Sequence, residues 1–399
     1  MTVRILARLF AIGALAFVVV TTVNALNKGG DATVFFEGGR RFLHAEPLYA
    51  GSSAADGFIG PPFQAAFFAP FAAVAGSSPV AARLLWHALN LVCLAFSVMV
   101  TVRWWNAARR DSDLLPRPWL GLAGPALVAT LLPLLTNFEH QNLNALLLAL
   151  LTAATYQLVL GSAPAAGVLI GVATALKAFP ALLILYLVAR RYWVAAIVAA
   201  LTAGALTVFV PLTAYGVSGF ADLAQTFWRL STSGWPVRGN NQSLVAAIDR
   251  LILGAGGTGV REASETPMTV VILAGVALVL LAAFVVVSFS RRPSRPAITV
   301  EITAVTVLAI LLSPIAWDHY WTLLLPAFLI VYDSREPKWL GPVGNYSFWC
   351  AAILTSGLSP LTLGASGFNA ARHRGTYTIA AIVIYAALLA LRNRLTTED

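Results

Sequence analysis

Long apolar runs recur along almost the whole chain, and they constrain its fold more than any other feature. Many approach the roughly 20 residues that an α-helix needs to cross about 30 Å of hydrocarbon. Because a backbone in hydrocarbon must satisfy its hydrogen bonds internally, such runs form helices. Only 11% of the residues are charged, against about 25% in a soluble protein. We therefore predict an all-α polytopic membrane protein with a single domain over residues 1–399.

We predict twelve transmembrane helices, several of them shorter than a simple span. The stretch 62–76 is apolar but short and contains Pro70, so we interpret it as an interfacial or re-entrant segment. The adjacent runs 164–176 and 179–189 are short enough to form a hairpin that turns below the membrane surface. The predicted helices cover residues 5–26, 80–102, 119–136, 142–160, 164–176, 179–189, 192–213, 268–290, 297–313, 320–332, 342–358 and 375–391.

Basic residues follow alternate predicted spans, which orients the chain. With twelve spans, fifteen of the 26 Lys and Arg residues fall on one side, in short loops. Short loops rich in Lys and Arg mark the cytoplasmic side of a membrane protein. We therefore expect both termini in the cytoplasm and the main outer loops at 27–79 and 214–267. The fifteen residues are Arg4, Arg8, Arg103, Arg109, Arg110, Arg117, Arg190, Arg191, Arg291, Arg292, Arg295, Arg335, Lys338, Arg392 and Arg394.

The first outer loop places Asp31 just beyond the first predicted span. Asp31 follows Gly29 and Gly30, which allow a sharp turn, and precedes a short amphipathic segment that contains Arg40 and Arg41. A carboxylate at the boundary between water and lipid can act as a general base on a substrate hydroxyl. The alternative is that Asp31 only caps the helix that follows it.

Two further outer segments combine polar side chains with short turns. TNFEHQNLNALL (136–147) brings His140, Gln141 and Asn142 into one turn. Polar groups at membrane depth need partners or a wet cavity, although a solvated turn with capping residues would also explain them. Lys177, in LKAFP, lies between two apolar runs. A phosphate would suit its charge, and snorkelling to the interface is the alternative.

Two later segments complete this set of polar residues. WPVRGNNQSL contains Asn241 and Gln242 before a predicted helix, which an Asn or Ser in this segment could simply cap. SPIAWDHYW places Asp318 and His319 among aromatic residues. Aromatic rings can stack on sugars and an imidazolium can pair with phosphate, but Trp and Tyr are also ordinary interface anchors. Each segment alone is weak evidence; together they gather on one predicted side.

The sequence predicts no metal, cofactor or nucleic-acid site. The five histidines are dispersed without HExxH spacing, and no P-loop or GxGxxG motif occurs in a suitable context. The two cysteines lie inside apolar runs, so a disulfide framework is not expected. The net charge of +9 reflects the basic loops, because no basic-aromatic module points to nucleic acid.

Six of these segments, in this order, resemble those of glycosyltransferase family 87, the polyprenyl-phosphate-mannose-dependent α-mannosyltransferases with a GT-C fold. They are GGDATVFF, GFIGPPF, HQNLN, LKAFP, GNNQS and SPIAWDHY, and they extend from residue 31 to about residue 326. The chain departs from the family pattern twice. Gly60 stands where a Tyr is common, and a Glu-His pair stands where a Gly often precedes the Gln. Both departures leave the transferred sugar open.

The resemblance implies a membrane glycosyltransferase of GT-C architecture on the non-cytoplasmic face of a bacterial inner membrane. Its partners would be a polyprenyl-phosphate-linked sugar donor, most simply of mannose, and a glycolipid or glycan acceptor in the lipid bilayer. The implied transfer is inverting and metal-independent, with Asp31 as general base and with Lys177 and His319 neutralising the leaving phosphate. The other implied substrate contacts are His140, Gln141, Asn142, Asn241, Gln242 and Asp318, with Arg40 and Arg41 as second-choice phosphate contacts.

Two other functional classes are compatible with many spans. Secondary transporters and lipid flippases place coupling residues near the bilayer midplane, on broken helices in two related halves. Here the charged residues lie at loop ends, which favours an enzyme. A non-catalytic assembly partner would tolerate substitution of Asp31.

Overall fold

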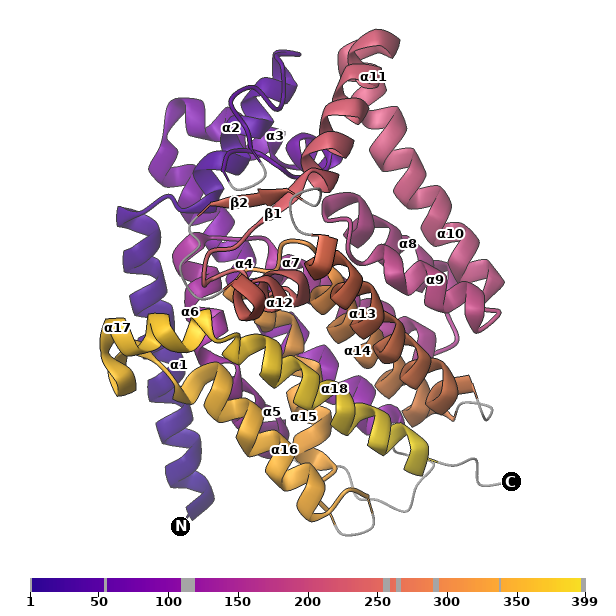
Figure 1. Ribbon diagram of the computed structural model, residues 1–399. Helices are drawn as coiled ribbons and strands as arrows, with labels where there is room; N and C mark the ends of the chain where they lie inside the picture. Colours follow the sequence, from indigo (N-terminus) through magenta and orange to yellow (C-terminus); the bar gives the residue numbers. More distant parts are fainter. Residues whose placement is uncertain are drawn as a thin grey trace.

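Helices form nearly all of the secondary structure in the computed structural model, which describes residues 2–53, 56–108, 119–253, 259–262, 267–289, 294–336 and 339–395 (Figure 1). Six basic residues used for the orientation, Arg109, Arg110, Arg117, Arg291, Arg292 and Lys338, lie outside these ranges. The described elements are α1 (Thr2–Asn27), α2 (Asp31–Leu43), α3 (Pro62–Ser77), α4 (Pro79–Ala108), α5 (Trp119–Ala129), α6 (Leu131–His140), α7 (Asn144–Val159), α8 (Ala163–Leu176), α9 (Ala181–Ala189), α10 (Trp193–Gly204), η1 (Ala205–Phe209), α11 (Val210–Thr232), β1 (Gly234–Pro236), α12 (Leu244–Leu253), β2 (Val260–Glu262), α13 (Pro267–Phe289), α14 (Arg295–Leu312), η3 (Asp318–Leu324), α15 (Leu325–Asp333), α16 (Pro342–Ala352), η4 (Ile353–Gly357), α17 (Pro360–His373) and α18 (Thr376–Arg394).

The helices coincide with the predicted spans, but fewer of them have the length of a full crossing. Among the described residues, six helices are long and apolar enough to cross a membrane, or eight if each of two bent pairs counts as one span. The pairs α5–α6 and α16/η4–α17 bend by 66° and 86°. Several predicted spans are instead short helices, such as α8 with 14 residues and α9 with 9. The chain is thus a multi-span helical membrane protein, and the number of twelve crossings stays a prediction.

A small antiparallel sheet within the predicted loop 214–267 departs from the all-α expectation. β1 and β2 pair Gly234 with Glu262, Trp235 with Arg261 and Pro236 with Val260. Strands of three residues are too short to give an alternating hydrophobic pattern, which explains why the sequence does not reveal them. A further backbone bridge joins Asn241 to Trp317, so this loop is tied to the segment between α14 and η3.

The core of the bundle is built around α14. Within the 18-residue apolar stretch of α14, 78% of the residues are buried, whereas in that of the neighbouring α13 only 6% are. α14 contacts α7, α9, α15 and α18, and its Thr303 and Thr306 hydroxyls donate to carbonyls one turn earlier. Those internal hydrogen bonds let polar side chains sit in an apolar core. α13 is apolar on its exposed surface, as a lipid-facing helix must be.

One end of the bundle gathers basic residues from several turns. Glu301, in α14, forms ion pairs with Arg190 after α9 and with Arg392 in the last turn of α18, and all three side chains are nearly fully buried. Trp105 at the end of α4 donates a 2.8 Å hydrogen bond to Asp333 at the end of α15. In Figure 1, the first turn of α1 and the last turn of α18 lie at the lower end of the bundle, whereas α2, α3 and the sheet lie at its upper end.

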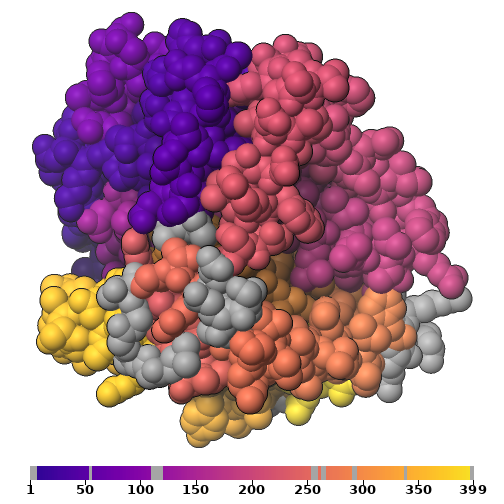
Figure 2. Space-filling model, turned by 45° about the horizontal axis from the view of Figure 1, so that its top comes forward, coloured from indigo at the N-terminus to yellow at the C-terminus, as the bar shows by residue number. Residues whose placement is uncertain are grey.

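The predicted interfacial stretch 62–76 forms α3, which packs against α2 and α4. Phe35 stacks on Phe68 with ring centroids 4.8 Å apart, and Phe36 stacks on Phe71. A Cβ atom on Gly39 would lie 2.7 Å from the carbonyl of Phe68, so glycine is what lets the two helices approach. In the space-filling view of the upper end, the indigo and violet surface of α2 and α3 adjoins the pink surface of α11 (Figure 2).

Candidate active site

A cavity of about 650 Å³ brings together polar residues from five separate parts of the chain. It lies between α2, the α6–α7 turn, the α8–α9 turn, the segment around β1 and the α14–η3 segment. Its lining contains five of the predicted site residues, and it also contains apolar side chains such as Phe35, Ile59, Phe179 and Leu182. The predicted residues that line it are Asp31, His140, Asn142, Lys177 and His319.

Asp31 is the first residue of α2, and the backbone before it determines where its carboxylate lies. Gly30 has φ +51°, and a Cβ atom there would lie 2.5 Å from the carbonyl oxygen of His140. The Asp31 Oδ2 atom accepts a 2.6 Å hydrogen bond from Asn142, and Oδ1 lies 4.0 Å from His140 Nδ1. In the described part of the chain, this carboxylate therefore bonds across to another turn and not to the first N–H groups of its own helix. That geometry favours a base over a simple helix cap.

The α6–α7 turn presents His140 and Asn142 to the cavity but holds Gln141 away from it. Gln141 has a left-handed backbone with φ 51°, and its carbonyl accepts a 2.7 Å hydrogen bond from Trp86. Its side chain is buried, lies 3.4 Å from the Lys28 carbonyl and does not line the cavity. Gln141 thus shapes the turn, whereas Asn142 contacts the candidate base.

Lys177 lies in an extended conformation between α8 and α9 and points inward. Its Nζ atom donates a 3.1 Å hydrogen bond to Asn144 Oδ1 and lies 3.5 Å from the centroid of the Tyr320 ring. Burial lowers the pKa of the ammonium, and the charge of Asp31 partly opposes that shift. No described carboxylate lies within ion-pair distance of this ammonium. A cation held by an amide oxygen and an aromatic ring can accept an incoming anion without first losing a carboxylate partner.

His319, in η3, lines the same cavity. Neither of its ring nitrogens makes a hydrogen bond to any described residue, although the ring is buried. Nδ1 lies 3.7 Å from Asp318 Oδ1, and the ring centroid lies 5.5 Å from that of His140. Burial, and then the charges of His140 and Lys177, hold the pKa of His319 well below its usual value. The imidazole is therefore neutral at pH 7 and has unused donor and acceptor capacity.

The expected sugar or phosphate contacts at Asn241 and Gln242 are not supported by the geometry. Both side chains are fully buried and neither lines the cavity. Asn241 donates to the carbonyls of Pro236 and Pro314 and accepts from Ala316 N–H. Gln242 donates to the carbonyl of Arg372 and accepts from Tyr377 N–H. Since their polar atoms already have backbone partners, they hold the outer loop to neighbouring segments instead.

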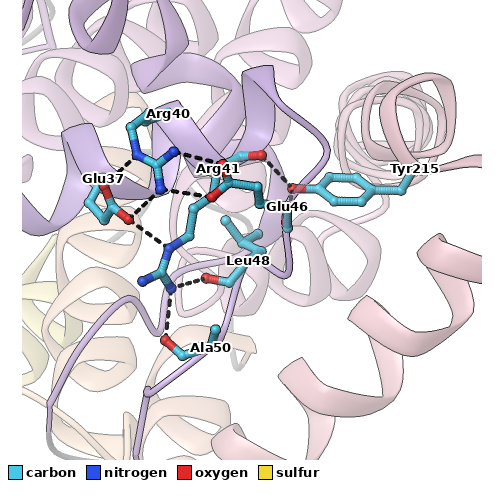
Figure 3. Close-up of polar contacts among 7 residues, drawn as sticks. All are labelled: Glu37, Arg40, Arg41, Glu46, Leu48, Ala50 and Tyr215. Carbon is cyan, nitrogen blue, oxygen red and sulfur yellow. Dashed lines mark hydrogen bonds and ion pairs between the residues drawn. The ribbon is translucent and has the colours of Figure 1, made fainter. Parts of the chain in front are cut away.

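Arg40 and Arg41, the second-choice phosphate contacts, are also outside the cavity lining. Arg40 bonds to Glu37 and Glu46, while Arg41 bonds to Glu37 and to two backbone carbonyls in the 45–50 loop (Figure 3). The two guanidinium groups lower the pKa of Glu37 to about 2. These arginines therefore brace the first outer loop against α2. Asp318 likewise lies outside the cavity lining, buried behind His319.

The structure adds residues to the cavity that the sequence-based set omits. Arg238 and Asp56 form an ion pair of 3.2 Å between two outer loops, and both line the cavity. Gln64, which follows the Pro61-Pro62 motif, is nearly buried and also lines it. Arg238 and the Pro-Pro motif lie within segments that the sequence singles out, but nothing local shows that they meet. Within the described ranges, no group of three or more His, Cys, Asp or Glu residues could hold a metal ion.

Comparisons with known proteins agree with the resemblance seen in the motifs. The chain is 27% identical over 370 residues to the polyprenol-phosphate-mannose-dependent alpha-(1-2)-phosphatidylinositol mannoside mannosyltransferase of Mycolicibacterium smegmatis, covering 84% of this chain and 76% of that one. It is 26% identical over 317 residues to the protein of the same name from Mycobacterium tuberculosis, covering 75% and 69%.

Similarity to a solved structure is weaker. The crystal structure of ArnT from Cupriavidus metallidurans bound to undecaprenyl phosphate aligns with 96% of this chain and 77% of that chain, at 16% identity. The TM-score is 0.41, which is too low to establish a shared fold. The family evidence is stronger, because the model of glycosyltransferase family 87 matches residues 58–314. That match covers more than half of the sequence, and the chain therefore belongs to glycosyltransferase family 87.

Proposed function

We propose that this membrane glycosyltransferase transfers mannose from a polyprenyl-phosphate donor to a hydroxyl of a glycolipid or glycan acceptor, with inversion and without a metal ion. The names of the two mycobacterial relatives support the donor, since both are described as dependent on polyprenol-phosphate-mannose. The GT-C architecture, the twelve crossings and a site on the non-cytoplasmic face of a bacterial inner membrane belong to the same proposal.

One observation carries the proposal: Asp31, His140, Lys177 and His319 line a single cavity. Inverting transfer needs a base for the acceptor hydroxyl on one side of the anomeric carbon and positive charge for the leaving phosphate on the other. Fixed groups that stabilise developing charge in an enclosed site are usually the largest contribution to such catalysis. The cavity volume of about 650 Å³ is in the usual range for a small-molecule site.

In the proposed reaction, Asp31 takes the proton of the acceptor hydroxyl as its oxygen bonds to C1 of the sugar. The bond from C1 to the donor phosphate oxygen breaks, and the electron pair leaves with the polyprenyl phosphate. Lys177 and His319 then pair with the added negative charge. The apolar side chains in the lining, which include Phe179 and Leu182, suit the first part of the lipid chain.

The test is transfer of radiolabelled mannose from polyprenyl-phosphate-mannose by the purified protein in lipid vesicles, with membrane glycolipids as acceptors. We expect Asp31→Asn to abolish transfer, because the amide cannot accept the proton. Glu139→Gln is the matched control: Glu139 is close in space but forms an exposed ion pair of 2.9 Å with Lys28 and does not line the cavity. Near-normal turnover by Asp31→Asn would exclude Asp31 as the base. Uptake of the donor into vesicles without any glycosylated product would favour a transporter instead.

A further inference from the structure

A chain of charged groups connects the end of α17 to the cavity. Arg372 Nη1 lies 3.4 Å from Asp318 Oδ2. The other carboxylate oxygen, Oδ1, accepts a 3.0 Å hydrogen bond from the backbone N–H of His319 and lies 3.7 Å from its ring Nδ1. One carboxylate oxygen of Asp318 thus pairs with Arg372, and the other contacts His319. Arg372 lies beyond the segment 58–314 that matches the family model and outside all six sequence motifs.

Arg372 is held in place by Gln242 and Phe368, neither of which lines the cavity. Its carbonyl accepts a 2.7 Å hydrogen bond from Gln242, and its guanidinium lies 5.0 Å from the ring centroid of Phe368. Gln242 in turn accepts from the N–H of Tyr377 at the start of α18. The buried amide of the GNNQS segment therefore fixes the position of Arg372, although it makes no contact with the cavity.

Burial disfavours the charged forms of both Asp318 and His319. Asp318 is 4% exposed and His319 3%, and burial raises the pKa of Asp318 while Arg372, followed by His140, lowers it. Glu139 raises the pKa of Asp318 slightly. The other titratable groups around His319 are His140, Lys177, Asp31 and Tyr320. Among these neighbours, Arg372 is the principal charge that favours the carboxylate form of Asp318.

We propose that Arg372 is a positioning residue, which keeps Asp318 ionised so that Asp318 orients the His319 ring with Nδ1 toward itself and leaves Nε2 for the donor phosphate. This rests on the proposed function in one respect, that the ligand of His319 is that phosphate. When the donor phosphate binds, His319 takes up a proton from solvent, so that Nδ1–H of the imidazolium points to Asp318 and Nε2–H donates to the phosphate, which gains negative charge as the bond to C1 breaks. Asp318 balances the imidazolium through Nδ1–H, as a carboxylate does for a reacting histidine elsewhere.

The test measures the protonation of His319 directly, by NMR of the protein labelled with ¹⁵N-histidine in lipid nanodiscs. The chain has five histidines, and His319→Gln identifies the signal of His319. With saturating undecaprenyl phosphate as the probe, we expect Arg372→Met to lower the titration midpoint of His319 by about one pH unit, because Asp318 becomes neutral. Arg372→Lys should restore it. Arg372→Gln, which keeps a hydrogen bond but no charge, should behave as Arg372→Met does.

A double-mutant cycle tests whether Arg372 acts through Asp318. Asp318→Asn should give the same shift, and Asp318→Asn combined with Arg372→Met should add nothing to it. The kcat/KM for the donor at pH 7 should fall about tenfold with each single change, in proportion to a shift of one unit. An unchanged His319 midpoint in both Arg372→Met and Arg372→Gln, or fully additive effects, would overturn the proposal.

Failure of the proposed function would look different. In that case the unsubstituted protein would not transfer sugar from polyprenyl-phosphate-mannose at all. The midpoint of His319 without any ligand would still report whether Arg372 controls it. A purely structural effect of the substitution would reduce the yield of folded protein but leave the midpoint of the folded fraction unchanged.

Discussion

The carboxylate of Asp31 accepts a 2.6 Å hydrogen bond from the side-chain amide of Asn142, although 111 residues separate the two in the chain. Asn142 is itself anchored, because its Oδ1 atom accepts a 2.8 Å hydrogen bond from the N–H of Leu143. One carboxylate oxygen is thus fixed, and the other faces His140. A base held in one orientation loses less freedom when it meets its substrate.

Replacing Asn142 should therefore slow the reaction more than it weakens binding. We expect Asn142→Ala to lower kcat by about ten- to a hundredfold, because the base loses the group that orients it. The radiolabelled transfer assay with varied donor measures this. Asn27→Ala is the control, since Asn27 is exposed and bonds only to a carbonyl of its own helix. If Asn142→Ala kept its kcat, the hydrogen bond would have no part in catalysis.

Gly30 should be essential for a steric reason that does not apply to every glycine with positive φ. Gly30→Ala places a Cβ atom 2.5 Å from the backbone of His140 and must displace Asp31. Gly51 also has positive φ, +73°, but nothing lies within 4 Å of a Cβ atom there. We expect the Gly30→Ala variant to lose most of its transferase activity. The Gly51→Ala variant should have only local backbone strain and should keep more of its activity. Equal activities of the two variants would show that the contact with His140 is not needed.

Lys177 should act on the donor through its charge. Lys177→Met is expected to raise the KM for the donor and to weaken inhibition by free polyprenyl phosphate, because the anion loses its partner. Tyr320→Phe retains the ring under the ammonium, so it should behave almost like the unsubstituted protein, whereas Tyr320→Leu should resemble a milder form of Lys177→Met. Donor titrations of the three variants check this. A KM that Lys177→Met leaves unchanged would contradict a role in phosphate binding.

Donor affinity should increase as pH falls. Burial holds the pKa of His319 well below its usual value in the free protein, and a bound phosphate raises it, so the complex holds more protons than the free protein. By linkage, binding is favoured at lower pH, in the window between the two pKa values. The donor phosphodiester keeps its single charge between pH 6 and pH 8, so the protein supplies the effect. His319→Gln should remove this dependence and His140→Gln should retain it, as isothermal titration at several pH values would show.

The buried ion pairs of Glu301 with Arg190 and Arg392 should contribute to the stability of the protein and not to its catalytic activity. Glu301→Gln leaves Arg190 and Arg392 without their buried carboxylate, and breaking such a pair costs roughly 3–5 kcal/mol. Thermal unfolding in detergent should show a clear loss, whereas Glu37→Gln, at a much more exposed pair, should change little. Activity per folded molecule should stay normal in both. A stable Glu301→Gln variant would mean that water or lipid headgroups replace the carboxylate.

The sequence predicts the helices well because each apolar run is a local property. It also brings out Asp31, Asn142, Lys177 and His319, because polar groups at membrane depth need partners or a wet cavity, although each segment alone is weak evidence. Their meeting in one cavity is compatible with the prediction that they share one side of the membrane, but that prediction alone does not bring them together. The number of full crossings is less accessible, because the sequence does not show where helices such as α5 and α6 bend against each other.

The functions of Asn241 and Gln242 could not be read locally. A run of amide side chains looks the same whether it binds a sugar or bonds to backbone carbonyls, and only the fold supplies those carbonyls. Arg372 is the converse case: it lies near the end of an apolar helix among other basic residues, and its importance depends on a carboxylate more than fifty positions earlier. Contacts of this kind come from tertiary packing, which no periodicity reports.

The ion pairs of Glu301 also set an order of events during synthesis. The chain is made from its N-terminus, so Arg190 is already in place when α14 enters the membrane, whereas Arg392 belongs to α18, which is made later. Until α18 inserts, Glu301 has only one of its two cationic partners, and the central helix of the bundle is incompletely neutralised. Assembly of this ion-pair cluster therefore waits for α18, and nascent chains that stop before α18 should be targets for membrane quality control.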